Sequence, residues 1–310
     1  QLEAANIVSK NKEMDENNVM TQKGLDLLKF KAIYGANGSG KSNVVKAMAA
    51  FWKIVCHSVT TDRILDFFIT PFYLNKKSLK EPSFFQMIFI FEGIQYRYGF
   101  EADREKIYSE WLFLKDKKEV PYFLRTEQEI EYYNKEKFQE AKVLFNKEGN
   151  IFRKNSLGLS VLTALNGKIS TIVFSYVRNI TILFGETDST PSNLSNKMND
   201  VNFKNKLSKF LRNVDPSIES IDKVEYQFNI KDNLERVTEY VIQRKLNNQV
   251  INFSLESEEA EGTKKLFYLS PILFRALEEG ISLVLDEFDA RLHPILSRKI
   301  VELFNSEETN

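Results

Sequence analysis

The residues best suited to chemistry form a glycine-rich stretch near the N-terminus. Residues 35–42 read Gly-Ala-Asn-Gly-Ser-Gly-Lys-Ser and match the pattern G-x-x-x-x-G-K-S/T. Glycines let the backbone turn so tightly that its N–H groups can point at phosphate oxygens. A lysine at this position reaches the β- and γ-phosphates of a nucleotide, and the serine after it can bind Mg²⁺. The stretch therefore predicts a phosphate-binding loop.

The residues on either side of this loop supply the structural context that it needs. Residues 27–34 are strand-like, and residues 43–52 place apolar side chains at helical spacing. The N-terminus of a helix favours bound anions, whereas a glycine turn that merely precedes a helix is the structural alternative. We expect ATP and Mg²⁺ as ligands, with Ser42 on the metal. The residues assigned to nucleotide binding are Asn37, Gly38, Ser39, Gly40, Lys41, Ser42 and Asn43.

A second candidate site lies near the C-terminus, where an apolar run ends in two carboxylates. Residues 281–285 are almost uninterruptedly apolar and precede Asp286 and Glu287. Such a run is typical of a strand that is buried on both faces of a parallel sheet. Carboxylates at its end cost free energy unless a metal or a reaction uses them. We predict that Asp286 binds Mg²⁺, directly or through water, and that Glu287 is the catalytic residue that polarises the attacking water. A buried strand that ends in an acidic turn is the alternative.

A third feature precedes this strand. Residues 258–265 read Glu-Glu-Ala-Glu-Gly-Thr-Lys-Lys and open a helix with one apolar side, in which Pro271 predicts a kink and Gly280 a C-cap. A small-residue turn at a helix N-terminus, followed by a carboxylate strand, is the signature arrangement of ABC-type ATPases. There the turn binds the γ-phosphate that the other subunit holds. On this interpretation Gly262 and Thr263 bind nucleotide; a plain helix start is the alternative.

Composition restricts the class of protein. The 310 residues can bury a substantial core in one or two domains. Because 43 Lys and Arg balance 43 Asp and Glu, a protein that wraps nucleic acid is disfavoured, although a local basic patch stays open. The single cysteine, Cys56, has no internal disulfide partner, which favours a cytoplasmic setting and a packing role. No apolar run reaches the ~20 residues that span a bilayer, so we expect no membrane partner.

The remaining pattern predicts a set of secondary-structure elements. Residues 1–24 are polar, residues 10–18 are predicted as a loop, and residues 127–145 are predicted as an exposed helix. Strands are predicted at 84–91, 94–101, 107–114, 120–124, 224–230 and 237–246, and further helices at 157–165 and 203–211. The first four strands are expected to form an antiparallel sheet with a turn at Glu92 and Gly93.

The long separation between Lys41 and Asp286 narrows the fold class. Compact P-loop folds place these residues close together in sequence, whereas ABC-type and SMC-type ATPases carry a long insertion between them. We therefore predict an α/β fold: an ABC/SMC-like P-loop ATPase head with a mixed parallel core sheet, an antiparallel β-lobe and a helical insertion. Within one head spanning 1–310, the predicted parts are a nucleotide core (1–58 and 250–310), the β-lobe (70–125) and the insertion (126–250).

Several segments, in order along the chain, resemble the AAA-family ATPases of the RloA and abortive-infection type, which have an ABC/SMC-like head. The matching segments are 33–43, 71–74, 96–101, 110–112, 261–265 and 286–294. The resemblance implies bacterial immunity against phage, by an ATPase that dimerises with a second copy and works with a co-encoded effector, a nuclease or a toxin. It also implies that residues 289–293 form the D-loop along the dimer seam.

Two departures from this family pattern stand out. The family-like signature carries Ser before Glu-Gly-Thr, where this chain has Ala260, so one hydrogen bond to the γ-phosphate is expected to be missing. The switch histidine of the family lies on a strand beyond the D-loop, and the sequence ends at Asn310 before reaching it. The histidines present are His57, expected to be a surface or packing residue, and His293. We therefore expect a fragment that lacks terminal parts of the fold.

Three other functions are alternatives. An SMC-type DNA-repair ATPase needs a long coiled coil, and residues 127–145 are too few for the ~3–4 heptads required. A transporter subunit needs a Leu-Ser-Gly-Gly-Gln signature, which is absent. A nucleotide-binding scaffold with little hydrolysis is disfavoured by the intact Lys41, Asp286 and Glu287, but the absent switch histidine keeps it open. Nucleic acid also stays open as a partner.

Overall fold

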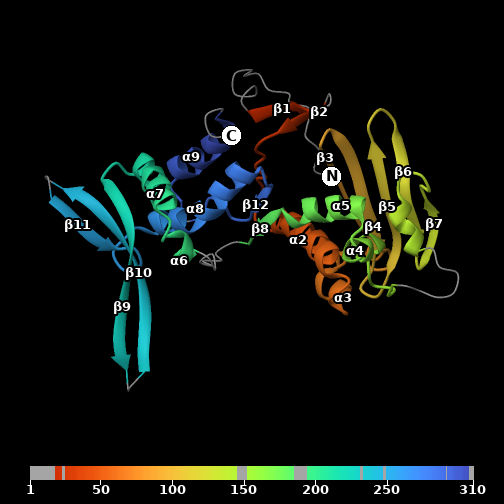
Figure 1. Ribbon diagram of the computed structural model, residues 1–310, viewed down its shortest axis with the longest axis horizontal. Coiled ribbons are helices and arrows are strands. Elements are labelled where there is room, and N and C mark those ends of the chain that lie inside the picture. Colours follow the sequence, from red (N-terminus) through yellow and green to blue (C-terminus); the bar gives the residue numbers. More distant parts are fainter. Residues whose placement is uncertain are drawn as a thin grey trace. The chain divides into compact units, whose positions relative to one another are not determined.

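The computed structural model describes residues 18–22, 25–144, 152–184, 194–230, 233–246, 249–290 and 292–306. Helices and strands gather in two compact units (Figure 1). The loop unit, which contains the glycine loop, comprises residues 22–25 and 33–182. The carboxylate unit, which contains Asp286 and Glu287, comprises residues 1–21, 26–32 and 183–310. Each unit has its own hydrophobic core.

The loop unit is built on a five-stranded antiparallel sheet in which the strands follow one another in sequence order. Its strands are β3 (Ser83–Phe91), β4 (Ile94–Ala102), β5 (Ile107–Lys115), β6 (Glu119–Thr126) and β7 (Glu129–Tyr133). Glu92 and Gly93 form the β3–β4 turn, both with positive φ, as tight hairpins require. The four strands predicted here are confirmed.

The exposed helix predicted at 127–145 is wrong. The chain instead turns at Glu127, whose φ is 50°, into β7, and then forms a short 3-10 helix, Gln139–Leu144. Ile130, Phe138 and Leu144 are buried in the core of the unit. The charged residues suggested a solvated helix, but pairing with β6 and burial of these apolar side chains outweigh that local preference.

Four helices pack on one face of this sheet: α2 (Lys41–His57), α3 (Ile64–Phe68), α4 (Gly158–Ala164) and α5 (Lys168–Arg178) (Figure 1). The predicted helices at 43–52 and 157–165 are thereby confirmed. Phe51 of α2 stacks on Phe100 of β4 with ring centroids 5.7 Å apart, and Tyr176 of α5 stacks on Phe89 of β3 at 3.9 Å. Aromatic packing therefore holds α2 and α5 against the sheet.

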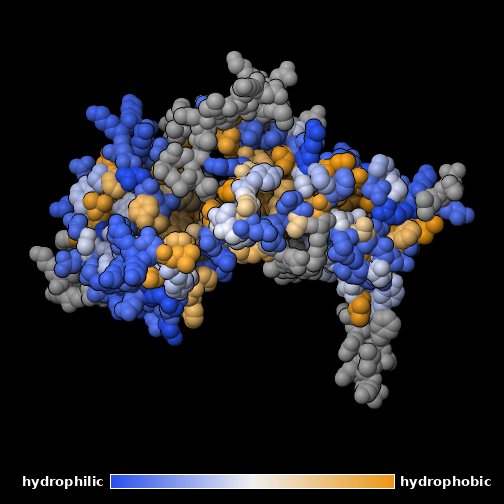
Figure 2. Space-filling model, turned by 180° about the vertical axis from the view of Figure 1, so that it is seen from behind, coloured by the Kyte–Doolittle hydropathy of each residue, from blue (hydrophilic) through white to orange (hydrophobic). Residues whose placement is uncertain are grey.

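The opposite face of the sheet keeps aromatic residues near the surface. Trp111 crosses Gly99 on the neighbouring strand and stacks on Phe84 at 5.4 Å. A Cβ atom at Gly99 would lie 2.5 Å from both the Trp111 ring and the Phe85 carbonyl oxygen, so this position requires glycine. On the side of the molecule that Figure 2 shows, hydrophobic residues form patches among hydrophilic ones.

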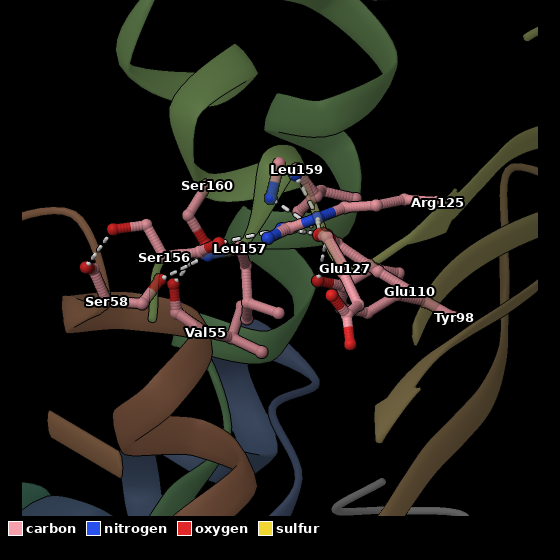
Figure 3. Close-up of polar contacts among 11 residues, drawn as sticks. Val55, Ser58, Tyr98, Glu110, Arg125, Glu127, Ser156, Leu157, Leu159 and Ser160 are labelled. Atoms are coloured by element: carbon pink, nitrogen blue, oxygen red, sulfur yellow. Dashed lines mark hydrogen bonds and ion pairs between the residues drawn. The ribbon is translucent and has the colours of Figure 1, made fainter. Parts of the chain in front are cut away.

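A buried ion pair lies between the sheet and the helices of the loop unit (Figure 3). Arg125 of β6 and Glu110 of β5 are 3.0 Å apart, and both side chains are completely buried. Glu110 also accepts hydrogen bonds from the Tyr98 hydroxyl at 2.9 Å and from the N–H groups of Gly158 and Leu159 at 2.7 and 3.0 Å. These two amides open α4, so Glu110 caps that helix from the sheet.

The same polar network reaches the C-terminal end of α2 (Figure 3). Arg125 donates to the carbonyl oxygen of Ser156 at 2.7 Å, and the Ser156 hydroxyl donates to the carbonyl oxygen of Ser58 at 2.9 Å. The Ser160 hydroxyl donates to the carbonyl oxygen of Val55 at 2.7 Å. Sheet, α4 and α2 are thus joined by hydrogen bonds that have no contact with solvent.

The carboxylate unit combines helices with small sheets. Its helices are α6 (Leu194–Lys197), α7 (Val201–Val214), α8 (Glu261–Glu279) and α9 (Pro294–Asn305). A three-stranded antiparallel sheet has the order β11-β10-β9, from Gln249–Ser254, Asn233–Leu246 and Ile218–Ile230. Two further pairs of short strands are β1 (Val19–Gln22) with β2 (Leu25–Leu28) and β8 (Thr181–Leu183) with β12 (Leu283–Leu285). Of these strands, residues 22, 25, 181 and 182 belong to the loop unit.

Several predictions for this unit are confirmed. The helix at 203–211 lies within α7, and the two strands at 224–230 and 237–246 lie within β9 and β10. Helix α8 ends at Gly280, which is left-handed with φ 63° as a C-cap requires, and it continues through the buried Pro271. The strand β11 was not predicted, because its exposed residues show no clear apolar alternation.

Two strand predictions are only partly right. Of residues 27–34, only 27 and 28 are in a strand, β2, and residues 29–36 form neither helix nor strand. Of residues 281–285, the last three form β12, and their side chains are partly exposed rather than buried on both faces. A strand is buried on both faces only between further strands and covering helices. Among the described residues, β12 pairs with β8 alone.

The mixed α/β class is therefore confirmed, whereas the mixed parallel core sheet is not among the sheets of the described residues. The loop predicted at residues 10–18 falls outside those residues apart from Asn18, the residue before β1. No helix in the described part of the chain is long and apolar enough to cross a membrane.

The buried ion pair yields a stability prediction. In Glu110→Ala, Arg125 keeps its charge in the core without a carboxylate, and the first amides of α4 lose their acceptor. Breaking such a pair costs about 3–5 kcal/mol, so the urea midpoint of unfolding should fall markedly.

The matched control is Glu119→Ala, which removes the carboxylate of a partly exposed pair with Arg97 on the same sheet. Its cost should stay near or below ~1 kcal/mol. Equal losses of stability in the two variants would show that the buried pair matters no more to folding than the partly exposed one.

Candidate nucleotide-binding site

The glycine loop is an exposed turn that leads directly into α2. Gly38 and Gly40 have φ values of 78° and 95°, in the left-handed region where side chains other than glycine are strained. A Cβ atom at Gly35 would lie 2.6 Å from the Ser39 hydroxyl oxygen. The backbone path itself thus requires glycine at Gly38 and Gly40, whereas at Gly35 the Ser39 side chain leaves little room for a Cβ atom.

Lys41, the first residue of α2, folds back over the loop. Its ammonium nitrogen donates to the carbonyl oxygens of Gly35 at 2.6 Å and Ala36 at 3.0 Å. The N–H group of Ser39 donates to the same Ala36 oxygen at 3.1 Å. The lysine charge is therefore already held at the loop, by neutral acceptors that an anion can replace.

The start of α2 also leaves amides without acceptors. Within the described residues, the N–H groups of Gly40, Lys41 and Ser42 donate no hydrogen bond, whereas those of Asn43 and Val44 donate to the Gly40 carbonyl oxygen. The first turn carries no acidic residue that would compete for these amides. Free amides, a helix N-terminus and an ammonium group together suit a phosphate.

A buried helix holds this exposed loop. Val45, Ala49 and Ile54 lie on the buried side of α2, and Trp52 donates from its indole nitrogen to the Arg178 carbonyl oxygen at 3.3 Å. The loop therefore stands on a helix that is fixed along its whole length, which is what a pre-formed anion site requires.

The two carboxylates follow β12 in the carboxylate unit. The Asp286 N–H group donates to the Leu183 carbonyl oxygen at 3.0 Å, which extends the pairing of β12 with β8. One Asp286 carboxylate oxygen accepts from the Glu287 N–H group at 3.1 Å. Asp286 is partly buried, whereas Glu287 is exposed and has a left-handed backbone with φ 49°.

The chain then turns into α9. The Ala290 N–H group donates to the Glu287 carbonyl oxygen at 3.0 Å, and the Leu292 N–H group donates to that of Asp289 at 3.1 Å. The His293 Nδ1 atom accepts from the Ile295 N–H group at 3.3 Å and so caps α9. The predicted D-loop, residues 289–293, is thus a turn, of which Arg291 lies outside the described residues.

The predicted signature residues open α8. Ala260 is the N-cap, and its side chain provides no capping hydrogen bond. The N–H groups of Thr263 and Lys264 donate to the Ala260 carbonyl oxygen, whereas that of Gly262 donates to no acceptor in the described chain. The turn can therefore offer a free amide to an anion, but without the hydroxyl group that a serine would add at position 260.

Sequence reasoning missed a clamp that holds the start of α8. Arg244 of β10 forms two hydrogen bonds with the Glu259 carboxylate, at 2.8 and 2.7 Å, and a third with Asp215 at 2.5 Å. Only 3% of the Glu259 side chain is exposed. Burial alone would raise the pKa of Asp215, but hydrogen bonds from Arg244 and Ser217 hold it below its ordinary value. No local signal in the sequence pairs residues so far apart.

Two residues near the end of α2, Cys56 and His57, lie in surroundings that suit a packing role. Burial raises the pKa of the Cys56 thiol to about 11, although the charges of Arg178 and Lys53 act in the opposite direction. Burial, and next the charge of Lys53, lowers the pKa of His57, whose ring lies 5.6 Å from that of Trp52. Their surroundings agree with the packing roles expected for both.

The structure brings the predicted site residues together in two sets. Asn37, Gly38, Ser39, Gly40, Lys41, Ser42 and Asn43 form the loop and the start of α2 in the loop unit. Asp286, Glu287, Gly262 and Thr263 belong to the carboxylate unit, where Lys265 of α8 donates to the carbonyl oxygens of Glu287 and Ala290. Joint action of the two sets on one nucleotide stays a prediction.

Comparison with known proteins places this arrangement in a family. The family described as "AAA domain, putative AbiEii toxin, Type IV TA system" matches residues 30–310, which include the glycine loop, the start of α8 and the carboxylates after β12. Neither the curated proteins nor the solved structures gave a significant match. Since the match spans nearly the whole chain and contains both sets of site residues, the chain belongs to this family of AAA-type P-loop ATPase domains, whose setting is toxin–antitoxin defence.

Proposed function

We propose that this protein binds ATP at the glycine loop and hydrolyses it with Mg²⁺. The observation that carries this proposal is the start of α2, where Gly40, Lys41 and Ser42 offer unpaired amides beside the Lys41 ammonium group. Membership of a P-loop ATPase family supports the same ligand. The loop has the donor set that a triphosphate needs, and its exposed position leaves it accessible.

Each residue has a separate role in the proposed reaction. Lys41 exchanges its loop carbonyls for the β- and γ-phosphate oxygens, while the free amides at the start of α2 bind phosphate oxygens beside it. The Ser42 hydroxyl and the Asp286 carboxylate would hold Mg²⁺, which when bound neutralises charge on the phosphates. Glu287 is exposed and accepts a proton from the attacking water as general base.

A second copy of the chain completes the proposed site. The support is the first turn of α8, where the Gly262 amide lacks an acceptor among the described residues, together with the likeness of this turn to an ABC-type signature. Such a turn binds the γ-phosphate in the partner subunit, so ATP joins two heads. Ala260 offers no hydroxyl group, so backbone amides and Thr263 would supply the contacts.

The cellular role proposed is that of a sensor or regulator in anti-phage defence. The family has a toxin–antitoxin setting, which supports an ATPase that controls a co-encoded nuclease or toxin through its own nucleotide state. ATP-driven association provides the two states that such control requires, namely separate heads and joined heads.

Nucleotide binding should depend on Lys41. Lys41→Ala removes the charge that meets the phosphates, and a charge-assisted contact is typically worth about 1.5–3 kcal/mol. The dissociation constant for ATP, measured by calorimetry, should therefore rise about tenfold or more. Lys46→Ala, which removes an exposed lysine of the same helix, is the control and should bind as the parent does. Unchanged affinity in Lys41→Ala would exclude the loop as the ATP site.

Glu287 should serve hydrolysis rather than binding. Glu287→Gln keeps the side-chain shape but cannot accept the proton, so phosphate release should slow by about 10²–10⁴-fold while ATP affinity stays close to that of the parent. Glu302→Gln, an exposed change on α9, should leave both quantities unchanged. If Glu287→Gln releases phosphate at the parent rate, Glu287 is not the general base.

Association should depend on the start of α8. In a Glu287→Gln background, ATP and Mg²⁺ should raise the mass measured by light scattering from one chain to two. Gly262→Asp places a negative charge where the γ-phosphate held by the partner belongs, and should abolish this increase while ATP binding persists. Asn252→Asp adds the same charge on the exposed strand β11 and should still associate. ATP-driven association of the Gly262→Asp protein would show that residues 261–263 are only a helix start.

A further inference from the structure

One lysine links the beginning of α8 to the turn that carries Glu287. Lys265 lies one turn into α8, and its ammonium nitrogen donates to the carbonyl oxygens of Glu287, at 3.3 Å, and Ala290. A single charged group therefore binds two backbone oxygens on either side of Phe288 and Asp289. Hydrogen bonds from a charged donor are stronger than those between neutral groups.

The turn needs such support, because its backbone is in an uncommon conformation. Glu287 has φ 49°, a left-handed value that a residue with a Cβ atom adopts only when its surroundings hold it there. Its N–H group is bound by the Asp286 carboxylate and its carbonyl oxygen by the Ala290 N–H group and by Lys265. The backbone of Glu287 is thus fixed while its carboxylate remains exposed.

The other end of this link is equally well held. Glu259, whose buried carboxylate is bound by Arg244, directly precedes Ala260, the N-cap of helix α8. The neighbouring Lys264 has a different partner, the Glu261 carboxylate at 2.8 Å. Of these two lysines, Lys265 therefore provides the contact between the start of α8 and the Glu287 turn.

We propose that Lys265 is a positioning residue for ATP hydrolysis, which holds the Glu287 turn through its carbonyl oxygens and couples that turn to the start of α8. The inference rests on the proposed function, and it adds a regulatory connection. The first turn of α8 is where the nucleotide of the partner subunit is expected to bind. Occupancy of that turn is then transmitted through Lys265 to the catalytic carboxylate of the same chain.

The test compares Lys265→Met with two other variants of the whole chain. Lys265→Arg keeps a charged donor that can reach carbonyl oxygens. Lys299→Met is the matched control, because Lys299 of α9 also donates to a backbone carbonyl oxygen, that of Asn213, but does not contact the Glu287 turn. Thermal unfolding of all three variants measures the general cost of losing such a contact.

The expected result is a separation of turnover from binding. In Lys265→Met, kcat should fall about 10–100-fold, since small displacements of a reacting group have effects of this size, while KM and the ATP dissociation constant change less than about twofold. Lys265→Arg should recover most of the lost turnover, and Lys299→Met should behave as the parent. Parent turnover in Lys265→Met, or an equal loss in Lys299→Met, would overturn the proposal.

A second measurement does not depend on catalysis. Hydrogen exchange, read by mass spectrometry, should become faster in peptides covering residues 285–293 of Lys265→Met but not of Lys299→Met. Unchanged exchange there would overturn the link itself. If instead Glu287→Gln hydrolyses ATP at the parent rate, the proposed function fails, and the exchange difference still reports whether Lys265 holds the turn.

Discussion

In the loop unit, the packing of α4 and α2 on the sheet depends on one buried ion pair. Glu110 and Arg125 meet where the sheet, the start of α4 and the end of α2 converge, and serines beside them extend the hydrogen-bond network to α2. Removing two charges from water is costly, so the pair persists only because hydroxyl, amide and carbonyl partners surround it. Removing either partner would leave the other charge unpaired in the core. The pair fixes one end of α2, and the glycine loop stands at the other.

In the carboxylate unit, charged side chains hold the two segments that carry the predicted site residues. Arg244 holds the residues just before α8, and Lys265 holds the turn after β12, each by binding acceptors that lie far away in the sequence. Both cations act on short segments that have little regular structure of their own. In this unit, polar contacts thus set the geometry of the segments that carry the predicted site residues. Phe203 and Phe210 pack edge-on against Phe274 of α8.

The sequence predicts best where the signal is local. The glycine loop, α2, the β3–β4 hairpin and the cap at Gly280 each follow from a few adjacent residues whose backbone needs are specific. It fails at residues 127–145, where pairing with β6 and burial of apolar side chains outweigh the local preference, and at residues 29–34, which form neither helix nor strand. It fails also at β12, where the predicted burial depends on neighbouring strands. The candidate residues could be identified by type, but Arg244 and Lys265 could not, because their partners are brought near only by folding.

The stacking of Trp111 across Gly99 has a spectroscopic consequence. The chain contains two tryptophans, and both Trp52 and Trp111 belong to the loop unit. The Trp52 indole donates to the end of α5, and Trp111 of the central strand β5 stacks on Phe84, so their emission reports on α2 and on the sheet. The carboxylate unit has no tryptophan of its own. Tryptophan fluorescence therefore reports on the loop unit alone, so the emission that a tryptophan introduced near α8 adds to that of Trp52 and Trp111 would report on the carboxylate unit.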